Sequence, residues 1–237
     1  MRWRVCCGPS AVIVALVTTV TTFAQQPGAP PRSPSPPTAA NNTVPVFFIE
    51  EWKQPTTPGD DHGAWPIAPT AVSNPNLELK LYGASGKDIQ LSGVLHSPTN
   101  PLNLWTGMTT SPVAATLREK SHYVDLTGRA KMRWVTRTSG LHRVWPIIKL
   151  ADATWLLGDQ PSGTWADFNQ SDVSFSEFRW IKLDIDRVVT TGRWVEKVDL
   201  AKVDEVGFAD VMPGSGHGPG GWVNVGRIEL YGKPINR

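Results

Sequence analysis

From about residue 46 onward, apolar and polar positions alternate over short runs that are separated by turn-forming residues. Alternation with a period of two is typical of β-strands that bury one face. No long stretch carries the helical period with caps, although residues 191–203 have room for one helical turn. The pattern predicts strands at 46–52, 77–83, 88–94, 113–119, 122–126, 130–137, 144–150, 154–159, 176–185, 203–210 and 226–232.

Many short strands spaced about ten residues apart predict an all-β fold, a jelly-roll β-sandwich of two antiparallel sheets with little helix. The alternation also assigns faces. The strand at 130–137 is expected to bury Met132 and Trp134, and the strand at 176–185 is expected to bury its aliphatic residues and turn Trp180 outward. If these strands and the strand at 144–150 are neighbours, one aromatic and cationic sheet face gathers Arg133, Arg137, Trp145, Lys149 and Trp180.

Three segments late in the chain carry a family resemblance: 180–185, 199–208, with its DL-x-x-V opening, and 228–231, which reads I-x-L-Y. In this order, with a Gly-rich connection, they resemble galactose-binding-like jelly rolls. The similar groups are family 11 carbohydrate-binding modules and the complex I intermediate-associated family. The resemblance covers roughly residues 46–232 and rests mostly on packing positions. It implies the fold, glycan binding as in many members, and a structural calcium ion as a common feature.

The N-terminus has the layout of a cleavable secretory signal. Arg2 and Arg4 precede an apolar run at 11–20, and small residues lead to a cleavage site near Ala24. The alternative is an uncleaved membrane anchor, for which the run is short. Residues 25–45 are rich in Pro, Ser and Ala, which predicts a disordered linker. Residues 46–237 are expected to form one domain that is secreted, periplasmic or extracellular and has no transmembrane span in the mature chain.

The net charge is close to zero, with 23 Lys and Arg residues and 21 Asp and Glu residues, and this gives no indication of a polyanionic partner. Nucleic acid is therefore not an expected partner. Eleven tryptophans are more informative, since Trp marks an aromatic core or a surface that stacks on flat ligands such as sugars. Trp155, beside two leucines, is expected in the core. Trp105 and Trp165 lie near turns and are expected at a loop-rimmed site.

The five histidines have no metal-ligand spacing, and no cofactor is required by any motif. The resemblance makes a structural calcium ion possible, and Ca²⁺ prefers carboxylates in loops. Asp152, Asp159 and Asp210 are the candidate ligands at strand ends. The alternative is that these acids simply end strands.

Residues 213–221 contain five glycines, with His217 among them. A connection of this length has one of two explanations. It wraps the end of the sandwich with Trp222 beneath it, or it places His217 and Asp210 at a ligand pocket or cation site.

No catalytic motif of the nucleophile-elbow or P-loop kind is present, so an enzyme is the less favoured interpretation. The sequence predicts an exported, non-catalytic carbohydrate-binding module for a glycan or polysaccharide. One alternative is an extracellular module for protein–protein interaction or assembly. A second alternative is a glycan-active hydrolase, which would need two carboxylates about a cleft.

Overall fold

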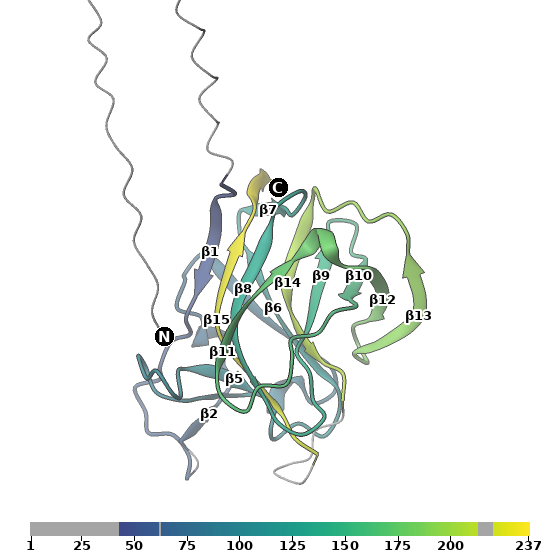
Figure 1. Cartoon of the computed structure of the whole chain (residues 1–237). Helices are drawn as coiled ribbons and strands as arrows, with labels where there is room; N and C mark the ends of the chain where they lie inside the picture. The colour runs from purple at the N-terminus through teal and green to yellow at the C-terminus, as the bar shows by residue number, and fades with distance from the viewer. Residues whose placement is uncertain (1–42, 62, 213–219) are drawn as a thin grey trace, which may run out of the picture. The chain divides into compact units, whose positions relative to one another are not determined.

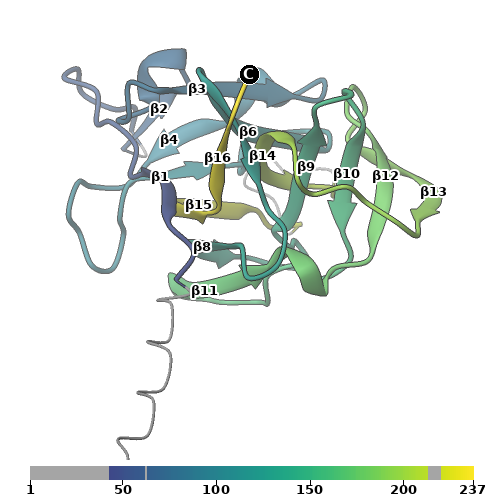
Figure 2. The same cartoon turned by 90° about the horizontal axis from the view of Figure 1, so that it is seen from above.

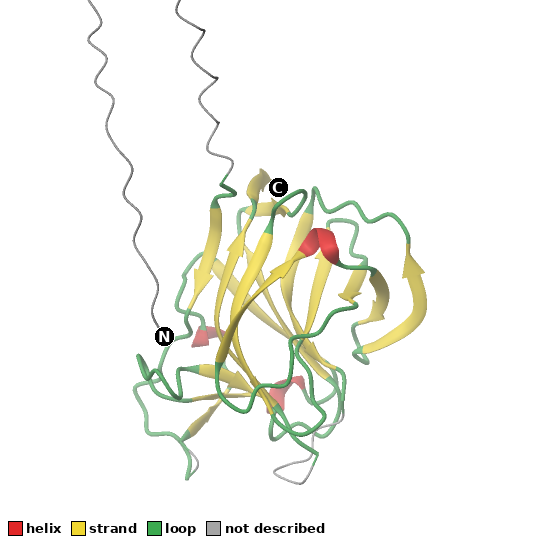
Figure 3. Cartoon of the chain, viewed as in Figure 1, coloured by secondary structure: helices red, strands yellow, loops and turns green. Residues whose placement is uncertain are grey.

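The computed structural model describes residues 43–61, 63–212 and 220–237, and these build two antiparallel sheets (Figures 1 and 3). Sheet A has seven strands in the order β11-β8-β15-β5-β4-β2, with β1 also paired to β15. Its strands are β1 (Val46–Glu50), β2 (Ala64–Pro66), β4 (Gln90–Ser92), β5 (Asn103–Trp105), β8 (Lys131–Thr138), β11 (Asn169–Ser174) and β15 (Val223–Tyr231).

Sheet B has nine strands in the order β13-β12-β10-β9-β14-β6-β3, with β7 paired to β14 and β16. Its strands are β3 (Leu77–Tyr82), β6 (Val113–Glu119), β7 (His122–Asp125), β9 (Trp145–Leu150), β10 (Trp155–Gly158), β12 (Trp180–Asp184), β13 (Val189–Val195), β14 (Val203–Asp210) and β16 (Lys233–Asn236). The predicted jelly-roll β-sandwich is confirmed.

Helical structure within the described residues is limited to three short 3₁₀ turns, η1 (Pro69–Ala71), η2 (Gly86–Asp88) and η3 (Phe175–Glu177). The helical turn considered for residues 191–203 is wrong, because β13 occupies the first part of that segment. The predicted ranges lack the short strands β2, β5 and β16 and the longer strands β11 and β13. Strands β11 and β13 are edge strands with largely polar or exposed positions, so neither shows the alternation that a buried face imposes.

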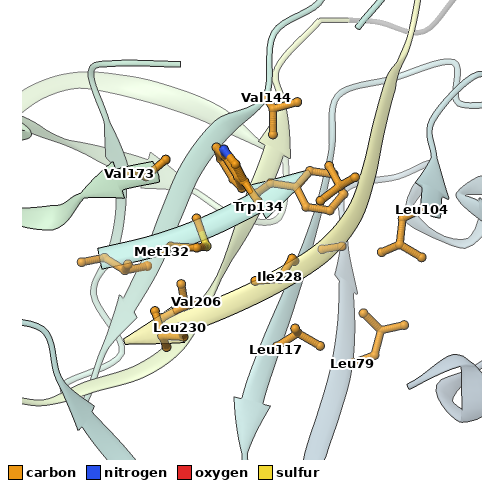
Figure 4. Packing of buried hydrophobic residues seen from close by; sticks show 14 of the residues in the cluster. Leu79, Leu104, Leu117, Met132, Trp134, Val144, Val173, Val206, Ile228 and Leu230 are labelled. Carbon is orange, nitrogen blue, oxygen red and sulfur yellow. The ribbon is translucent and has the colours of Figure 1, made fainter. Parts of the chain in front are cut away.

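The main core lies between the two sheets (Figure 4). Strand β8 alternates between buried and half-buried positions, as predicted, and it places Met132 and Trp134 inside with no exposed surface. Opposite them on β15, Ile228 and Leu230 are equally buried. Burial of such side chains is worth roughly 1.5–3 kcal/mol each.

The prediction for β12 is wrong, because Trp180 is in the main core with only 3% of its surface exposed. Ile181 and Leu183 point to the other face of sheet B and pack there in a second cluster. The face of β12 that carries Trp180 also carries Lys182 and Asp184, whereas the other face carries Ile181 and Leu183, so alternation alone pointed to the wrong face.

The second cluster exists because sheet B curls. Strands β3 and β10 are separated by three others, which in a flat sheet would put them about 19 Å apart. Nevertheless the rings of Tyr82 on β3 and Trp155 on β10 meet edge to face, with centroids 4.9 Å apart. Figure 2 shows β9, β10, β12 and β13 following one another around one side of the molecule. We call the surface away from the main core the outer face of sheet B.

Candidate functional site

Arg137 lies near the end of β8, on the face of sheet A that points away from the core. Its Nε donates a hydrogen bond of 3.2 Å to the side-chain oxygen of Asn224, the residue paired with it on β15. Asn224 is itself fixed by donating to Asn103 at 2.8 Å. The guanidinium also lies 4.9 Å from the centre of the Phe168 ring. These contacts hold the cation in one place.

In the part of the chain that the structure describes, no carboxylate lies within ion-pair distance of Arg137. Burial lowers the pKa of this guanidinium from its ordinary value, and only the negative charge of Asp167 opposes that shift. Arg133, on the same face of β8, is different. Its Nε lies 2.7 Å from the carboxylate of Asp172, and this hydrogen bond is the main reason why the pKa of Asp172 falls to about 2.

Trp165 presents an exposed ring beside Arg137, with 41% of its surface accessible. Its backbone is pinned to the end of β8 by two hydrogen bonds. The Trp165 N–H donates to the Thr138 hydroxyl at 3.2 Å, and the Thr138 N–H donates to the Trp165 carbonyl at 3.0 Å. An exposed aromatic ring on a fixed backbone loses little entropy when it contacts a ligand.

Trp222 forms the next part of the same wall. Its ring packs edge to face on Trp105, with centroids 6.4 Å apart, and Trp105 is itself only 7% exposed. The indole N–H of Trp222 is buried and finds no acceptor among the residues with described positions. Trp105 therefore supports the wall from below and does not face a ligand directly.

These side chains surround a hollow of about 500 Å³, within the range that accepts a small ligand. The hollow is lined by Arg137, Thr138, Ser139, Gly140, Thr164, Trp165, Ala166 and Trp222. We call it the β8-end hollow. Trp165 also lines an adjoining hollow of about 200 Å³, so open space continues beyond its ring.

Two other predicted residues, Trp145 and Lys149, lie on the outer face of sheet B, where the buried Ile147 shares that face between them. Lys149 is committed to internal contacts. Its Nζ is 3.0 Å from the Glu205 carboxylate and 5.6 Å from the centre of the Trp155 ring. This face is largely closed by the curl of the sheet, and it is a weaker candidate for a ligand.

Glu205 is the centre of that face and its side chain is fully buried. It accepts hydrogen bonds from Thr116 at 2.7 Å, from Tyr82 at 2.8 Å and from two lysines. Burial would raise the pKa of Glu205, but these hydrogen bonds outweigh it and lower the pKa. Burial and the Glu205 carboxylate together raise the pKa of the Tyr82 hydroxyl well above its ordinary range.

The prediction that these aromatic and cationic residues share one sheet face is wrong. Strand β8 belongs to sheet A, whereas β9 and β12 belong to sheet B and are separated there by β10. Arg133 is paired with Asp172, and Trp180 is in the core. The structure does bring Arg137, Trp165 and Trp105 together at one end of the sandwich.

The three acids considered for calcium are not gathered into one site. Asp152 caps the β9–β10 turn by accepting from the Thr154 N–H, and Asp159 holds Arg179 at 2.8 Å. Asp210 is fully buried and accepts from the Thr106 hydroxyl. Among the described residues no group of three or more His, Cys, Asp or Glu side chains could hold a metal ion.

His217 lies outside the described residues, as does most of the Gly-rich loop. Another histidine, His142, contacts Asp210. It is fully buried, and its Nδ1 lies 2.7 Å from an Asp210 oxygen. Asp210 therefore has structural partners at this end of β14.

The sequence did not single out Phe168 or Asn224, which position Arg137. Both depend on cross-strand neighbours that one sequence does not show. Trp155, expected in the core, is half-buried on the outer face of sheet B, and the Lys–Trp contact there has no sequence signal either.

No helix in the described ranges is long and apolar enough to span a bilayer. No protein-family model matches the chain, and no curated protein matches it. Several solved structures match the chain. The family 11 carbohydrate-binding module of a cellulosomal cellulase from Clostridium thermocellum aligns at 15% identity and a TM-score of 0.42, covering 72% of this chain and 95% of that chain.

The family 11 module from Clostridium thermocellum in complex with a β-1,3-1,4-mixed-linked tetrasaccharide aligns at 13% identity and a TM-score of 0.37, covering 80% and 98% of the two chains. An exo-β-agarase aligns at 10% identity and a TM-score of 0.36, covering 69% of this chain and 24% of that one. Similarity of this degree assigns neither a site nor a ligand. The resemblance to the complex I intermediate-associated family stays a prediction.

Proposed function

We propose that this protein is an exported carbohydrate-binding module and that it binds glycan in the β8-end hollow. The observation that carries the proposal is the exposed, backbone-anchored ring of Trp165 next to the fixed guanidinium of Arg137. Sugar rings present flat C–H faces that stack on indole rings, and their hydroxyls accept hydrogen bonds from cationic donors. The hydroxyls of Ser139 and Thr164 add further polar groups around the ring.

A binding role is favoured over hydrolysis at this hollow. Glycoside hydrolysis ordinarily needs two carboxylates about the bond that breaks. The described lining of the hollow contains neither Asp nor Glu. Its open form and its extension past Trp165 suit a glycan chain that lies across the surface.

Export is part of the proposal and rests on the N-terminal residues. The two arginines, the apolar run at 11–20 and the small residues before position 25 have the order of a secretory signal. Edman sequencing or mass spectrometry of protein recovered from the producing cell would test it, with a new N-terminus close to residue 25 as the expected result.

The test of glycan binding is a glycan array together with pull-down on insoluble polysaccharides, using the whole protein and two tryptophan variants. We expect Trp165→Ala to reduce binding about tenfold or more, because stacking on an aromatic ring is lost. Trp194→Ala is the matched control, since Trp194 on β13 is also exposed, at 53%, and belongs to the other sheet. Absence of binding to neutral and acidic glycans by the folded protein would reject the proposal.

A second candidate function is protein–protein interaction, and Trp194 is the observation that favours it. Its ring is covered by the guanidinium of Arg179 at 4.8 Å, and both line an apolar groove of about 500 Å³. Tryptophan and arginine are common at the centres of protein interfaces. This function predicts that cross-linking yields a partner or a dimer that Trp194→Ala abolishes, with glycan binding absent.

A further inference from the structure

Arg137 brings a positive charge into the wall of the β8-end hollow, and among the described residues no carboxylate forms an ion pair with it. We infer that the hollow selects carbohydrate bearing a carboxylate, a uronate residue, and that Arg137 is the residue that selects it. This inference rests on the proposed function, because it names the ligand class of the same hollow.

Among the described residues, nothing hydrogen-bonds to the two terminal nitrogens of Arg137, which form its carboxylate-binding edge. Its Nε is used by Asn224, and one flat face is covered by Phe168. A guanidinium fork of this kind matches the two oxygens of a carboxylate, which it binds through parallel hydrogen bonds.

The desolvation of the Arg137 guanidinium also favours a carboxylate ligand. A partly desolvated cation lowers the stability of the fold unless an opposite charge compensates it. Burial lowers the pKa of Arg137, whereas the hydrogen bond to Asp172 raises the pKa of Arg133. The two arginines belong to one strand and one face, but Arg137 is the more buried of the two and, among the described residues, has no carboxylate within ion-pair distance. A ligand carboxylate at Arg137 would supply such a partner.

The position beside Trp165 narrows the ligand to an acidic sugar. Both residues line one hollow, so a ligand can stack on the indole and reach the guanidinium at the same time. A uronate carries an apolar ring face and a carboxylate on the same ring. A neutral hexose offers the stacking face and hydroxyl groups but no charge, and a free inorganic anion offers the charge without the stacking face.

The experiment compares trimers of galacturonate, glucuronate and mannuronate with their fully methyl-esterified forms, which keep the ring and remove the charge. Titration calorimetry would use the whole protein, Arg137→Gln and, as the matched control, Arg133→Gln. We expect at least one uronate trimer to bind about tenfold or more tightly than its ester, as charge-assisted hydrogen bonds are worth that much. Arg137→Gln should remove this preference, and Arg133→Gln should keep it.

Two further measurements separate charge-dependent binding from an effect of the substitution on folding. Raising the salt concentration from 20 to 200 mM should weaken uronate binding and leave ester binding unchanged. A melting curve for each variant shows that it is folded. Equal affinity for trimers and esters, or an equal loss of both in Arg137→Gln, would overturn the inference and leave glycan binding standing. Failure of every glycan to bind would overturn both.

Discussion

Arg133 and Arg137 project from the same face of β8, and only Arg133 is paired with a carboxylate in the described structure. The pair forms because Asp172 on β11 lies directly opposite Arg133. The residue opposite Arg137 on β15 is Asn224, which offers a neutral oxygen. Two identical side chains four positions apart therefore differ in whether their charge is satisfied within the protein.

This difference predicts opposite effects on stability. Arg137→Met replaces a partly buried cation by an unbranched apolar side chain, so the melting temperature should stay the same or rise by up to about 3 °C. Arg133→Met should lower it slightly, because Asp172 loses its partner. Differential scanning calorimetry without ligand would measure both. A clear fall for Arg137→Met would mean that Arg137 serves the fold instead of a ligand.

Acid stability should depend on Glu205. Its pKa in the folded protein lies below its ordinary value of 4.5, so the unfolded chain binds a proton more readily. The stability that Glu205 contributes is therefore complete above about pH 4.5 and is lost as the pH falls through the folded pKa.

Urea unfolding between pH 7 and pH 2.5 would test this dependence. Glu205→Gln should be less stable at pH 7 and should lose less stability on acidification. Glu51→Gln is the control, because the Glu51 side chain is 56% exposed. Parallel pH curves for the native protein and Glu205→Gln would contradict the role given to this carboxylate.

Gly207 should not tolerate a side chain. A Cβ atom at this position on β14 would lie 2.1 Å from the carbonyl oxygen of Ala115 on the neighbouring strand. Gly207→Ala must push two central strands of sheet B apart, at a cost of about 2–3 kcal/mol or more.

Gly226→Ala on β15 is the matched control for Gly207→Ala, since its Cβ would come no closer than 3.4 Å to any neighbour. Chemical denaturation of both variants measures the difference. Equal losses of stability would show that the close approach at Gly207 is not what limits the strand.

Trp180→Ala should damage the fold, although the sequence suggested an exposed ligand-binding ring. Trp180 is 3% exposed and packs edge to face with Phe178 at 5.3 Å, so its loss should cost about 3–5 kcal/mol. Trp194→Ala on the paired strand β13 should change stability by less than about 1 kcal/mol, because Trp194 is 53% exposed. A stable, non-binding Trp180→Ala protein would restore the original interpretation.

Alternation along the chain determined the all-β class and the buried face of β8, which places Met132 and Trp134 inside. Composition and turn residues marked Trp165 as a candidate for an exposed position, and the structure places it on the rim of a hollow. Edge strands β11 and β13 escaped prediction, because no face of an exposed strand must be apolar.

The tertiary structure alone decided which strands are neighbours, and this decided the site. Strand pairing joins residues far apart in the sequence, so Arg133 gains Asp172 from β11 and Arg137 gains Asn224 from β15. The curl of sheet B turned the outer side of β12 into a second apolar cluster and put Trp180 in the main core. A sequence states which side chains share one face of a strand. The sheet order and curvature then determine whether that face meets solvent, a carboxylate or another sheet.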